Sequence, residues 1–320
     1  MRPVRPVLAG ALLGMLALSG CGQNSSSSPA SPAVSSGTGS APAAQAAGFP
    51  VTVQAGNGSV TIARKPERVV SLSPTATESL FAVGAGTQVV AVDDQSTYPA
   101  EAPKTDLSGF KPNAEAIIAQ KPDLVVLAND IDGIVAKLTK VNVPVLLEPA
   151  ATKLDETYDQ IGDLGAATGN KPKADEVVAG MRKRIDELAA AAPKDKNLTY
   201  YHELDTTPYS VTSSTFLGQV YGLFGLTNIA DKAPDPAGGY PKLSAEFVAQ
   251  ADPDLVFLAD TKCCAQTAAT LAKRPGWSKL SAVKKDRVVE LDDDVASRWG
   301  PRVVDLAEKV GEAVRKAAAD

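Results

Sequence analysis

From residue 51 onward, short apolar runs alternate with segments whose apolar residues recur at helical spacing. The runs predict buried strands and the spaced segments predict amphipathic helices. The expected strands are residues 51–53, 60–62, 68–72, 88–92, 124–127, 143–147, 198–204, 255–258 and 287–291. The expected helices are residues 74–83, 113–120, 131–140, 173–192, 214–224, 244–251, 267–273 and 301–317. The first two strands predict a hairpin, and the rest of the alternation predicts an α/β fold with parallel sheets covered by helices on both faces.

One stretch of the pattern occurs twice. Residues 113–128 (NAEAIIAQKPDLVVLA) and residues 244–259 (SAEFVAQADPDLVFLA) align without a gap at an offset of 131, with 8 of 16 positions identical. Each copy starts with a helix-capping residue type and carries a glutamate two residues later, Glu115 and Glu246. The repeat predicts two structurally equivalent lobes.

The segment between the repeats predicts how the lobes are joined. Its helix at 173–192 has 20 residues, which corresponds to roughly 30 Å. A helix of this length indicates a spine that fixes the separation of two Rossmann-like lobes, with a ligand cleft between them. The expected organisation is a leader (1–20), a linker (21–50), a first lobe (51–170), a spine (171–195) and a second lobe (196–320).

A helix start is also expected near Pro74. The run Thr75-Ala76-Thr77-Glu78 has the spacing of a capping box, in which the glutamate side chain turns back to the helix N-terminus.

The N-terminal residues are typical of a processed leader. Arg2 and Arg5 precede an apolar run at 7–18, which is too short to span a bilayer. The following Leu18-Ser19-Gly20-Cys21 resembles a bacterial lipobox, which implies cleavage before Cys21 and a diacylglycerol on its sulfur. Residues 22–48 then contain 22 Ser, Ala, Gly or Pro among 27 positions and no charge, as expected of a flexible linker. We therefore expect a protein anchored at Cys21 to the outer face of the cytoplasmic membrane.

Composition excludes several classes of function. The chain has a formal net charge of −5 and no basic run, which argues against a nucleic-acid partner. A single histidine, His202, argues against multi-histidine zinc sites. Neither a nucleophile elbow nor a dinucleotide-binding loop is present, so we expect no catalytic residues and no cofactor.

In parallel α/β sheets, ligands bind beyond the carboxyl ends of the strands. The loops there are residues 73–77, 93–98, 105–111, 129–131, 205–209, 231–242, 260–266 and 292–300. The aromatic residues in these loops are Tyr98, Phe110, Tyr209, Tyr240 and Trp299, and their basic residues include Lys111, Lys242, Lys262 and Arg298. Stacking faces with a fixed guanidinium suit a flat or oxygen-rich metal chelate.

The chain resembles the solute-binding lipoproteins of ABC importers for ferric siderophores, haem and cobalamin, the class III periplasmic binding proteins. The segments that carry the resemblance are RVVSLSPTATESLFAVGAG, PNAEAIIAQKPDLVVLAND, LSAEFVAQADPDLVFLAD and SRWGPRVV, within residues 64–318. The resemblance implies a monomer that binds a metal chelate and docks Glu115 and Glu246 onto arginines of a dimeric permease. It also implies that Arg298, in the R-x-x-P-R pattern, contacts the ligand.

The sequence leaves the identity of the ligand open. A ferric siderophore is favoured. Cobalamin is ranked second, since the R-x-x-P-R pattern fits it but only Trp299 offers a tryptophan in the cleft. Haem is third because it needs His202 or a tyrosine as axial ligand. A rival class is a surface enzyme that reduces or hydrolyses metal chelates.

Three further features favour structural roles. His202 lies inside an expected strand, and Trp277 lies on the side away from the cleft, so both are expected to pack. The acidic triplet Asp292-Asp293-Asp294 is expected to form salt bridges or a solvated turn, and we expect no direct metal ligand.

Cys263 and Cys264 are the only cysteines besides Cys21. Outside the cytoplasm disulfides persist, so these two residues either form a vicinal disulfide at the cleft rim or remain partly buried thiols. Such a ring strains the peptide between its cysteines. Both alternatives stay open from the sequence.

Overall fold

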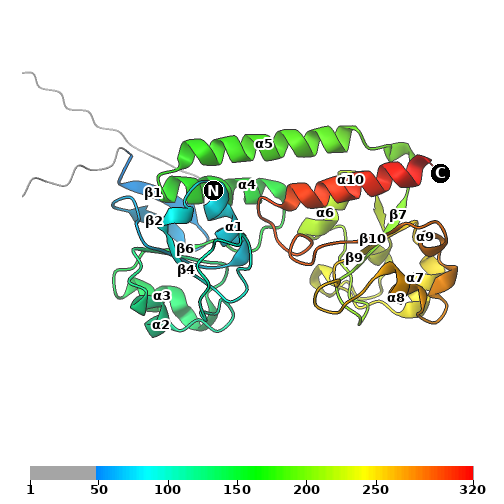
Figure 1. The fold of residues 1–320 in the computed structure, drawn as a ribbon, viewed down its shortest axis with the longest axis horizontal. Coiled ribbons are helices and arrows are strands. Elements are labelled where there is room, and N and C mark those ends of the chain that lie inside the picture. Colours follow the sequence, from blue (N-terminus) through cyan, green and yellow to red (C-terminus); the bar gives the residue numbers. More distant parts are fainter. Residues whose placement is uncertain (1–47, 320) are drawn as a thin grey trace, which may run out of the picture. The chain divides into compact units, whose positions relative to one another are not determined.

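The computed structural model describes residues 48–319, which form a hairpin and two α/β lobes (Figure 1). The hairpin consists of β1 (Val51–Ala55) and β2 (Gly58–Ile62), which pair antiparallel as expected. The leader, Cys21 and most of the linker lie outside the described residues. Within the part that is described, no helix has the length and apolar character needed to cross a membrane.

The first lobe contains a parallel sheet of four strands in the order β4-β3-β5-β6. Its strands are β3 (Val69–Leu72), β4 (Val89–Val92), β5 (Leu124–Leu127) and β6 (Val145–Leu147). Its helices are α1 (Pro74–Ala82), α2 (Ala114–Ala119), α3 (Ile134–Thr139) and α4 (Leu154–Ala167). Each strand lies within the range expected from its apolar run.

The second lobe repeats this plan with the parallel order β10-β9-β7-β8. Its strands are β7 (Thr199–Glu203), β8 (Thr227–Asn228), β9 (Leu255–Leu258) and β10 (Val288–Glu290). Its helices are α6 (Phe216–Gly222), α7 (Ala245–Ala251), α8 (Ala268–Ala272), α9 (Ser281–Lys284) and the closing α10 (Val303–Ala319). The sequence pattern missed β8 and α9, because a two-residue polar strand and a four-residue helix are too short to show a period.

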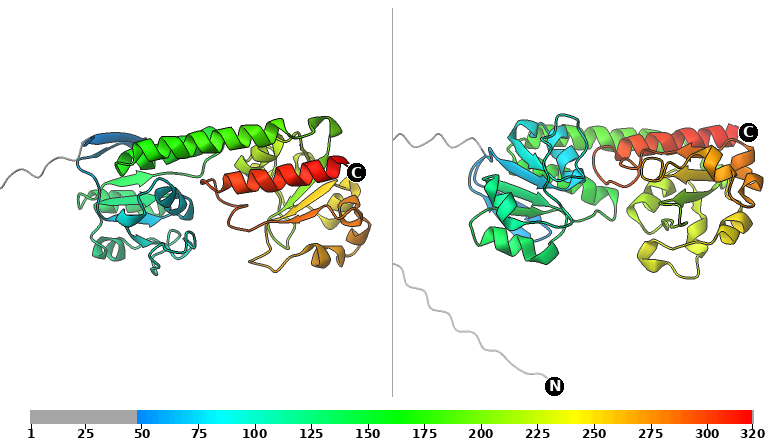
Figure 2. Two further views of the ribbon diagram at one scale, coloured as in Figure 1. Left: turned by 45° about the horizontal axis from the view of Figure 1, so that its top comes forward. Right: turned by 60° about the horizontal axis from the view of Figure 1, so that its bottom comes forward.

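The spine helix is α5 (Lys171–Ala190), which has the expected 20 residues but begins two residues earlier. Its Pro172 occupies the first turn, where a missing backbone N–H costs nothing. Figures 1 and 2 show α10 running alongside α5. An ion pair of 2.7 Å between Arg184 of α5 and Glu308 of α10 joins the two helices at their surface.

Alternation along the strands explains how the lobes are packed. On β7, Tyr200 belongs to a hydrophobic cluster that also contains Met181 and Ile185 of α5 and Leu80 of α1. The next residue, Tyr201, points to the other face and packs in a separate cluster of the second lobe. Because successive strand residues face opposite sides, each sheet has a local core on one face and shares a continuous core with α5 on the other. The shared core joins the lobes through the spine.

The start of α1 differs from the expected capping box. Ser73 is the N-cap, and its side chain accepts a hydrogen bond from the backbone N–H of Ala76. The helix begins at Pro74 as expected, but its N-cap lies two residues before Thr75 of the predicted box, and Glu78 lies on the buried face of the helix with 2% of its surface exposed. The capping role expected for Glu78 was wrong, because Ser73 is the N-cap and the Glu78 carboxylate accepts hydrogen bonds from Arg298 and Arg302.

Candidate ligand-binding site

A hollow of about 470 Å³ lies at the carboxyl ends of the first-lobe strands. It is formed by the ends of β3, β4 and β5, by the first turn of α1, and by residues 294–299 of the chain segment that leads into α10. Its apolar lining includes Leu72, Pro74, Phe110 and Trp299. Its polar lining consists of Ser73, Thr75, Asp93, Gln95, Asn129, Asp294, Ser297 and Arg298. The volume lies in the usual range of small-molecule sites.

Arg298 lies in this hollow, but acidic neighbours hold its guanidinium. Nη1 donates to Glu78 Oε1 at 2.7 Å, and Nη2 donates to Asp294 Oδ1 at 2.7 Å. Only 10% of the Arg298 side chain and 1% of the Glu78 side chain are exposed. The expected fixed guanidinium is therefore present, and it is held by Glu78, for which the sequence pattern predicts a helix-capping role.

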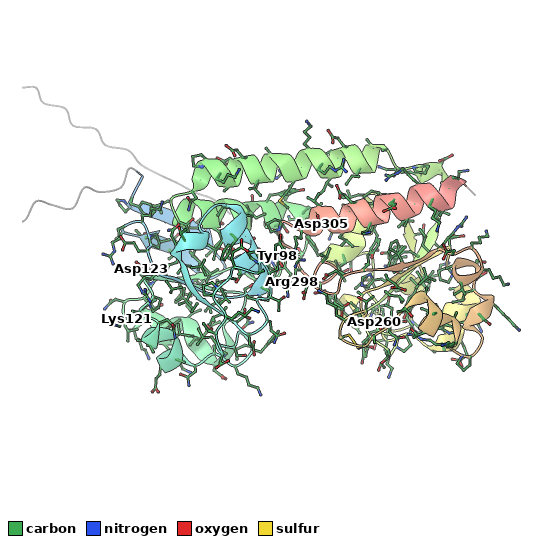
Figure 3. All side chains as sticks on the ribbon, in the orientation of Figure 1. Tyr98, Lys121, Asp123, Asp260, Arg298 and Asp305 are labelled. Carbon is green, nitrogen blue, oxygen red and sulfur yellow. A yellow bond between two sulfur atoms is a disulfide. The ribbon has the colours of Figure 1, made fainter. Side chains whose placement is uncertain are left out.

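Arg302 completes this cluster. It donates to both carboxylate oxygens of Glu78, at 2.9 and 2.6 Å, and its guanidinium carbon stands 4.3 Å from the centre of the Tyr98 ring. The hydrogen bonds to Glu78 raise the pKa of Arg302 above its usual value. Figure 3 shows Tyr98 and Arg298 close together, where the segment that carries Arg298 meets the first lobe. Two carboxylates, Glu78 and Asp294, and two guanidinium groups, Arg298 and Arg302, thus form one connected network beside the hollow, in which the formal charges cancel.

The structure separates the five predicted aromatic residues into three groups. Phe110 and Trp299 line the hollow, and Trp299 Nε1 donates to Gln160 Oε1 at 3.1 Å. Tyr98 stacks on Arg302 and is not part of the lining. Tyr209 and Tyr240 lie on second-lobe loops, where Lys242 Nζ stands 5.9 Å from the Tyr209 ring. The exposed fractions are 47% for Tyr98, 69% for Phe110, 39% for Tyr209 and 49% for Tyr240.

Glu148 is a buried carboxyl group that the sequence did not reveal, and it lies near Trp299. Glu148 follows β6 and lines a small internal hollow together with Thr157 and Trp299. It is only 5% exposed, and its Oε1 has no hydrogen-bond partner among the described residues. Burial, with a smaller contribution from Asp163, raises the pKa of Glu148 to about 8.

A second acidic cluster lies at the carboxyl ends of the second-lobe strands. Arg274 makes two hydrogen bonds of 2.6 Å to the buried Glu203, and the Tyr201 hydroxyl donates to the same carboxylate. Asp260 is fully buried beside them. Burial first, and then the nearby Glu203 charge, raise the pKa of Asp260 to about 7. The cluster holds fewer cations than carboxylates.

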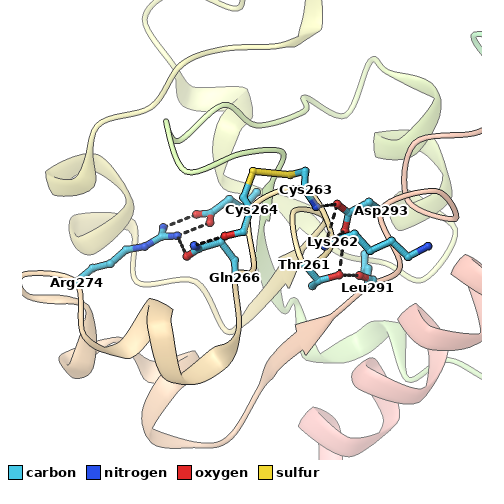
Figure 4. The surroundings of a disulfide bond; sticks show 9 residues. Thr261, Lys262, Cys263, Cys264, Gln266, Arg274, Leu291 and Asp293 are labelled. Atoms are coloured by element: carbon cyan, nitrogen blue, oxygen red, sulfur yellow. Dashed lines mark hydrogen bonds and ion pairs between the residues drawn. A yellow bond between two sulfur atoms is a disulfide. The ribbon is translucent and has the colours of Figure 1, made fainter. Parts of the chain in front are cut away.

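Cys263 and Cys264 form a vicinal disulfide in the loop that follows this cluster (Figure 4). Their Cα atoms are 3.8 Å apart. Asp293 fixes the loop by accepting hydrogen bonds from the backbone N–H of Cys263 at 2.8 Å and from the Thr261 hydroxyl at 2.9 Å.

The acidic triplet acts as a salt-bridge partner, as expected. Lys262 Nζ pairs with Asp292 at 2.8 Å and with Asp294 at 3.2 Å. Within residues 48–319, no group of three His, Cys, Asp or Glu side chains is arranged to hold a metal ion.

His202 and Trp277 are packed residues. His202 is fully buried, its Nδ1 lies 2.8 Å from the Tyr221 hydroxyl, and burial lowers its pKa to about 3. Trp277 packs edge-on against Tyr201, with ring centres 6.0 Å apart. Neither side chain reaches the hollow.

Glu115 and Glu246 occupy equivalent places on the two lobes. They stand in the first turns of α2 and α7, whose N-caps are Asn113 and Ser244. Both glutamates are exposed, and neither has an ion pair or side-chain hydrogen bond within the described part of the chain. Figure 1 shows α2 and α7 on the side of the lobes away from α5.

Known proteins share this architecture. Residues 69–295 match the periplasmic binding protein family. An uncharacterized ABC transporter substrate-binding lipoprotein of Bacillus subtilis (strain 168), YvrC, is 32% identical over 83% of this chain and 86% of its own. A cobalamin-binding protein of Halobacterium salinarum is 31% identical over 85% of this chain and 76% of its own.

A solved structure extends the comparison. The periplasmic vitamin B12 binding protein BtuF of Vibrio cholerae superposes with a TM-score of 0.64 at 27% identity, covering 79% of this chain and 98% of BtuF. The expected α/β fold with two lobes is thereby confirmed. The proteins that resemble this chain bind solutes and are not enzymes, which excludes the surface enzyme. The chain belongs to the periplasmic binding protein family and is a solute-binding protein.

Proposed function

We propose that this protein captures a metal chelate outside the cytoplasm and delivers it to the permease of an ABC importer. The observation that carries the proposal is the 470 Å³ hollow at the strand ends, which Phe110, Trp299 and the held Arg298 line together. Such a site suits a large ligand with flat surfaces and many oxygen atoms. The likeness to YvrC, an ABC transporter substrate-binding lipoprotein, supports the delivery step.

Among metal chelates we place cobalamin first. The sequence favoured a ferric siderophore, but a relative that covers most of the chain is a cobalamin-binding protein, and BtuF binds vitamin B12. A ferric siderophore comes second. Haem remains third, because His202 is buried against Tyr221 and only the exposed tyrosines offer an axial ligand.

Membrane attachment through Cys21 belongs to the same proposal. Cys21 lies outside the described residues, so its role rests on the lipobox resemblance and on the description of YvrC as a lipoprotein. A Cys21→Ser chain would be released from membranes and would lack diacylglycerol. It is therefore also the form to use for binding measurements in solution.

The test is a titration of the Cys21→Ser chain with cyanocobalamin, a ferric hydroxamate and haemin, followed by calorimetry or by quenching of tryptophan fluorescence. We expect saturable one-to-one binding of one of these chelates without turnover. Chemical conversion of a chelate, or no binding of any of them, would contradict the proposal.

A matched pair of variants tests whether the ligand binds in the hollow beside Arg298. Arg298→Ala is expected to weaken binding by about 1–3 kcal/mol, the scale of a hydrogen bond to a charged group. Arg184→Ala removes an arginine from α5, far from the hollow, and is expected to leave the affinity unchanged. Equal affinities in the two variants would place the ligand elsewhere.

A further inference from the structure

The loops that follow the strands of both lobes carry many more carboxylates than bases. Together they contain 11 aspartates and 5 lysines or arginines, in residues 73–77, 93–98, 105–111, 129–131, 205–209, 231–242, 260–266 and 292–300. We infer that the cleft selects a neutral or positively charged chelate and rejects anionic ones. This inference rests on the proposed function and specifies the class of its ligand.

The bases nearest the hollow are already engaged. Arg298 pairs with Glu78 and Asp294, and Arg302 pairs with Glu78. Lys262 pairs with Asp292 and Asp294. The two guanidinium groups and one ammonium group are therefore matched by the three carboxylates of Glu78, Asp292 and Asp294, and they offer no net positive charge to a ligand.

The lining of the hollow likewise contains more carboxyl groups than bases. Arg298 is the only base among the lining residues, against the two carboxyl groups of Asp93 and Asp294. Burial raises the pKa of Asp93, and its protonated form still adds no positive charge. The other polar groups are hydroxyls and amides, including those of Ser73, Gln95 and Asn129. These groups can hydrogen-bond a neutral, amide-rich ligand without a counter-charge.

The remaining lysines of the loops lie away from this lining. Lys111, Lys232 and Lys242 are exposed, and none of them lines the hollow. Lys242 stands over the Tyr209 ring of the second lobe. A ligand with several carboxylates or phenolates would thus meet at most a few solvated ammonium groups at the rim.

The excess of carboxylates over bases in these loops should make binding depend on the charge of the ligand. A cleft that carries an excess of one sign of charge concentrates the field between its low-dielectric walls, so it attracts ligands of the opposite sign and repels ligands of the same sign. An anion placed against Arg298 must also compete with carboxylates that hold the guanidinium with good geometry. Neutral ligands avoid both costs.

The test uses two series of probes in which the metal centre is constant and the charge of one peripheral group changes. The first is cyanocobalamin and the monocarboxylic acid made by hydrolysing one of its side-chain amides. The second is ferric desferrioxamine B, which is cationic, with its neutral N-acetyl and anionic N-succinyl derivatives. In the series that binds the Cys21→Ser chain, we expect the anionic member to bind about three- to tenfold more weakly than the neutral one. We also expect this gap to narrow as salt is added.

The outcomes separate this inference from the proposed function. Equal or tighter binding of the anionic member overturns the charge selectivity and leaves a chelate-binding protein. Haemin carries two carboxylates, so binding of haemin and of no other probe would also overturn the charge selectivity and leave a chelate-binding protein. If no probe of either series binds and haemin does not bind, the proposed function fails and the inference fails with it.

Variants test the cause of the selectivity. Glu78→Gln keeps the size of the side chain but leaves a guanidinium without its full counter-charge, so the ratio of anionic to neutral affinity should rise about three- to tenfold. Asp294→Asn makes the same change at a more exposed position, should Glu78→Gln fail to fold. Glu176→Gln on α5 removes one charge far from the cleft and should leave the ratio unchanged. An unchanged ratio in a folded Glu78→Gln or Asp294→Asn chain contradicts the inference.

Discussion

Glu78 of α1 accepts two hydrogen bonds from Arg302, at 2.9 and 2.6 Å, across 224 positions of sequence. Glu78 belongs to the first lobe, whereas Arg302 directly precedes α10, which packs along α5 and in the core shared with the second lobe. The pair therefore ties the first lobe to the closing helix in addition to the connection through α5. It also fixes the chain segment that carries Arg298 and Trp299 into the hollow.

Loss of this tie should destabilise the protein strongly. Glu78→Ala leaves the partly buried guanidinium of Arg302 without its carboxylate partner and leaves Arg298 with Asp294 alone, and removal of one member of a buried pair costs about 3–5 kcal/mol. Denaturant unfolding of the Cys21→Ser chain measures the free energy of unfolding. Glu176→Ala, at an exposed ion pair of α5, serves as control and should cost less than about 1 kcal/mol. Similar losses in the two variants would show that the Glu78 cluster contributes little.

Delivery should depend on the equivalent glutamates of the two lobes. Glu115→Ala combined with Glu246→Ala is expected to abolish uptake of the chelate by cells and to leave its binding nearly unchanged, because both side chains are exposed and make no internal contact. The matched control is Asp175→Ala with Glu176→Ala, which removes two acidic groups from the exposed surface of α5. Normal uptake by the Glu115 and Glu246 double variant would exclude the docking role.

Glu148 should make stability depend on pH. Its folded-state pKa is about 8, against 4.5 for the free group, so its contribution to stability is complete below about pH 4.5 and is lost as pH rises towards 8. Glu148→Gln has no carboxyl group to ionise, so it should not show this loss. The gain in the free energy of unfolding that the substitution gives should be about 2–4 kcal/mol larger at pH 8 than near pH 5. Denaturant unfolding at the two pH values gives the difference, with the exposed Glu101→Gln as control. A pH-independent effect of Glu148→Gln would show that the buried carboxyl group is ionised.

The vicinal disulfide can be checked by mass. Protein purified without reductant should be about 2 Da lighter than the dithiol form and should resist alkylation until it is reduced. Reduction adds two electrons and two protons, and both thiols should then react. Two thiols that alkylate at once in fresh, unreduced protein would contradict the bond between Cys263 and Cys264.

Much of the fold follows from the sequence because buried parallel strands are short apolar runs. The run at Leu124–Leu127 and its repeat at Leu255–Leu258 coincide with β5 and β9. The 131-residue offset also predicted that Glu115 and Glu246 would occupy equivalent helix starts. These features depend on local patterns, which a sequence displays directly.

The site was less predictable because its key contacts are long-range. Nothing near Glu78 in the sequence indicates that it pairs with Arg298 and Arg302, more than 200 residues away. The buried state of Glu148 likewise depends on Thr157 and Trp299, which come from other elements. Loop aromatics were identified by position, but only Phe110 and Trp299 of the five line the hollow, since loop conformation decides which side chains converge.

The most direct test of the account is native mass spectrometry of the protein purified from its own cells. We expect one metal chelate per chain, with the mass of a corrinoid or a ferric siderophore, released on unfolding. A chain that carries a sugar, a peptide or another metal-free solute in its place would contradict it.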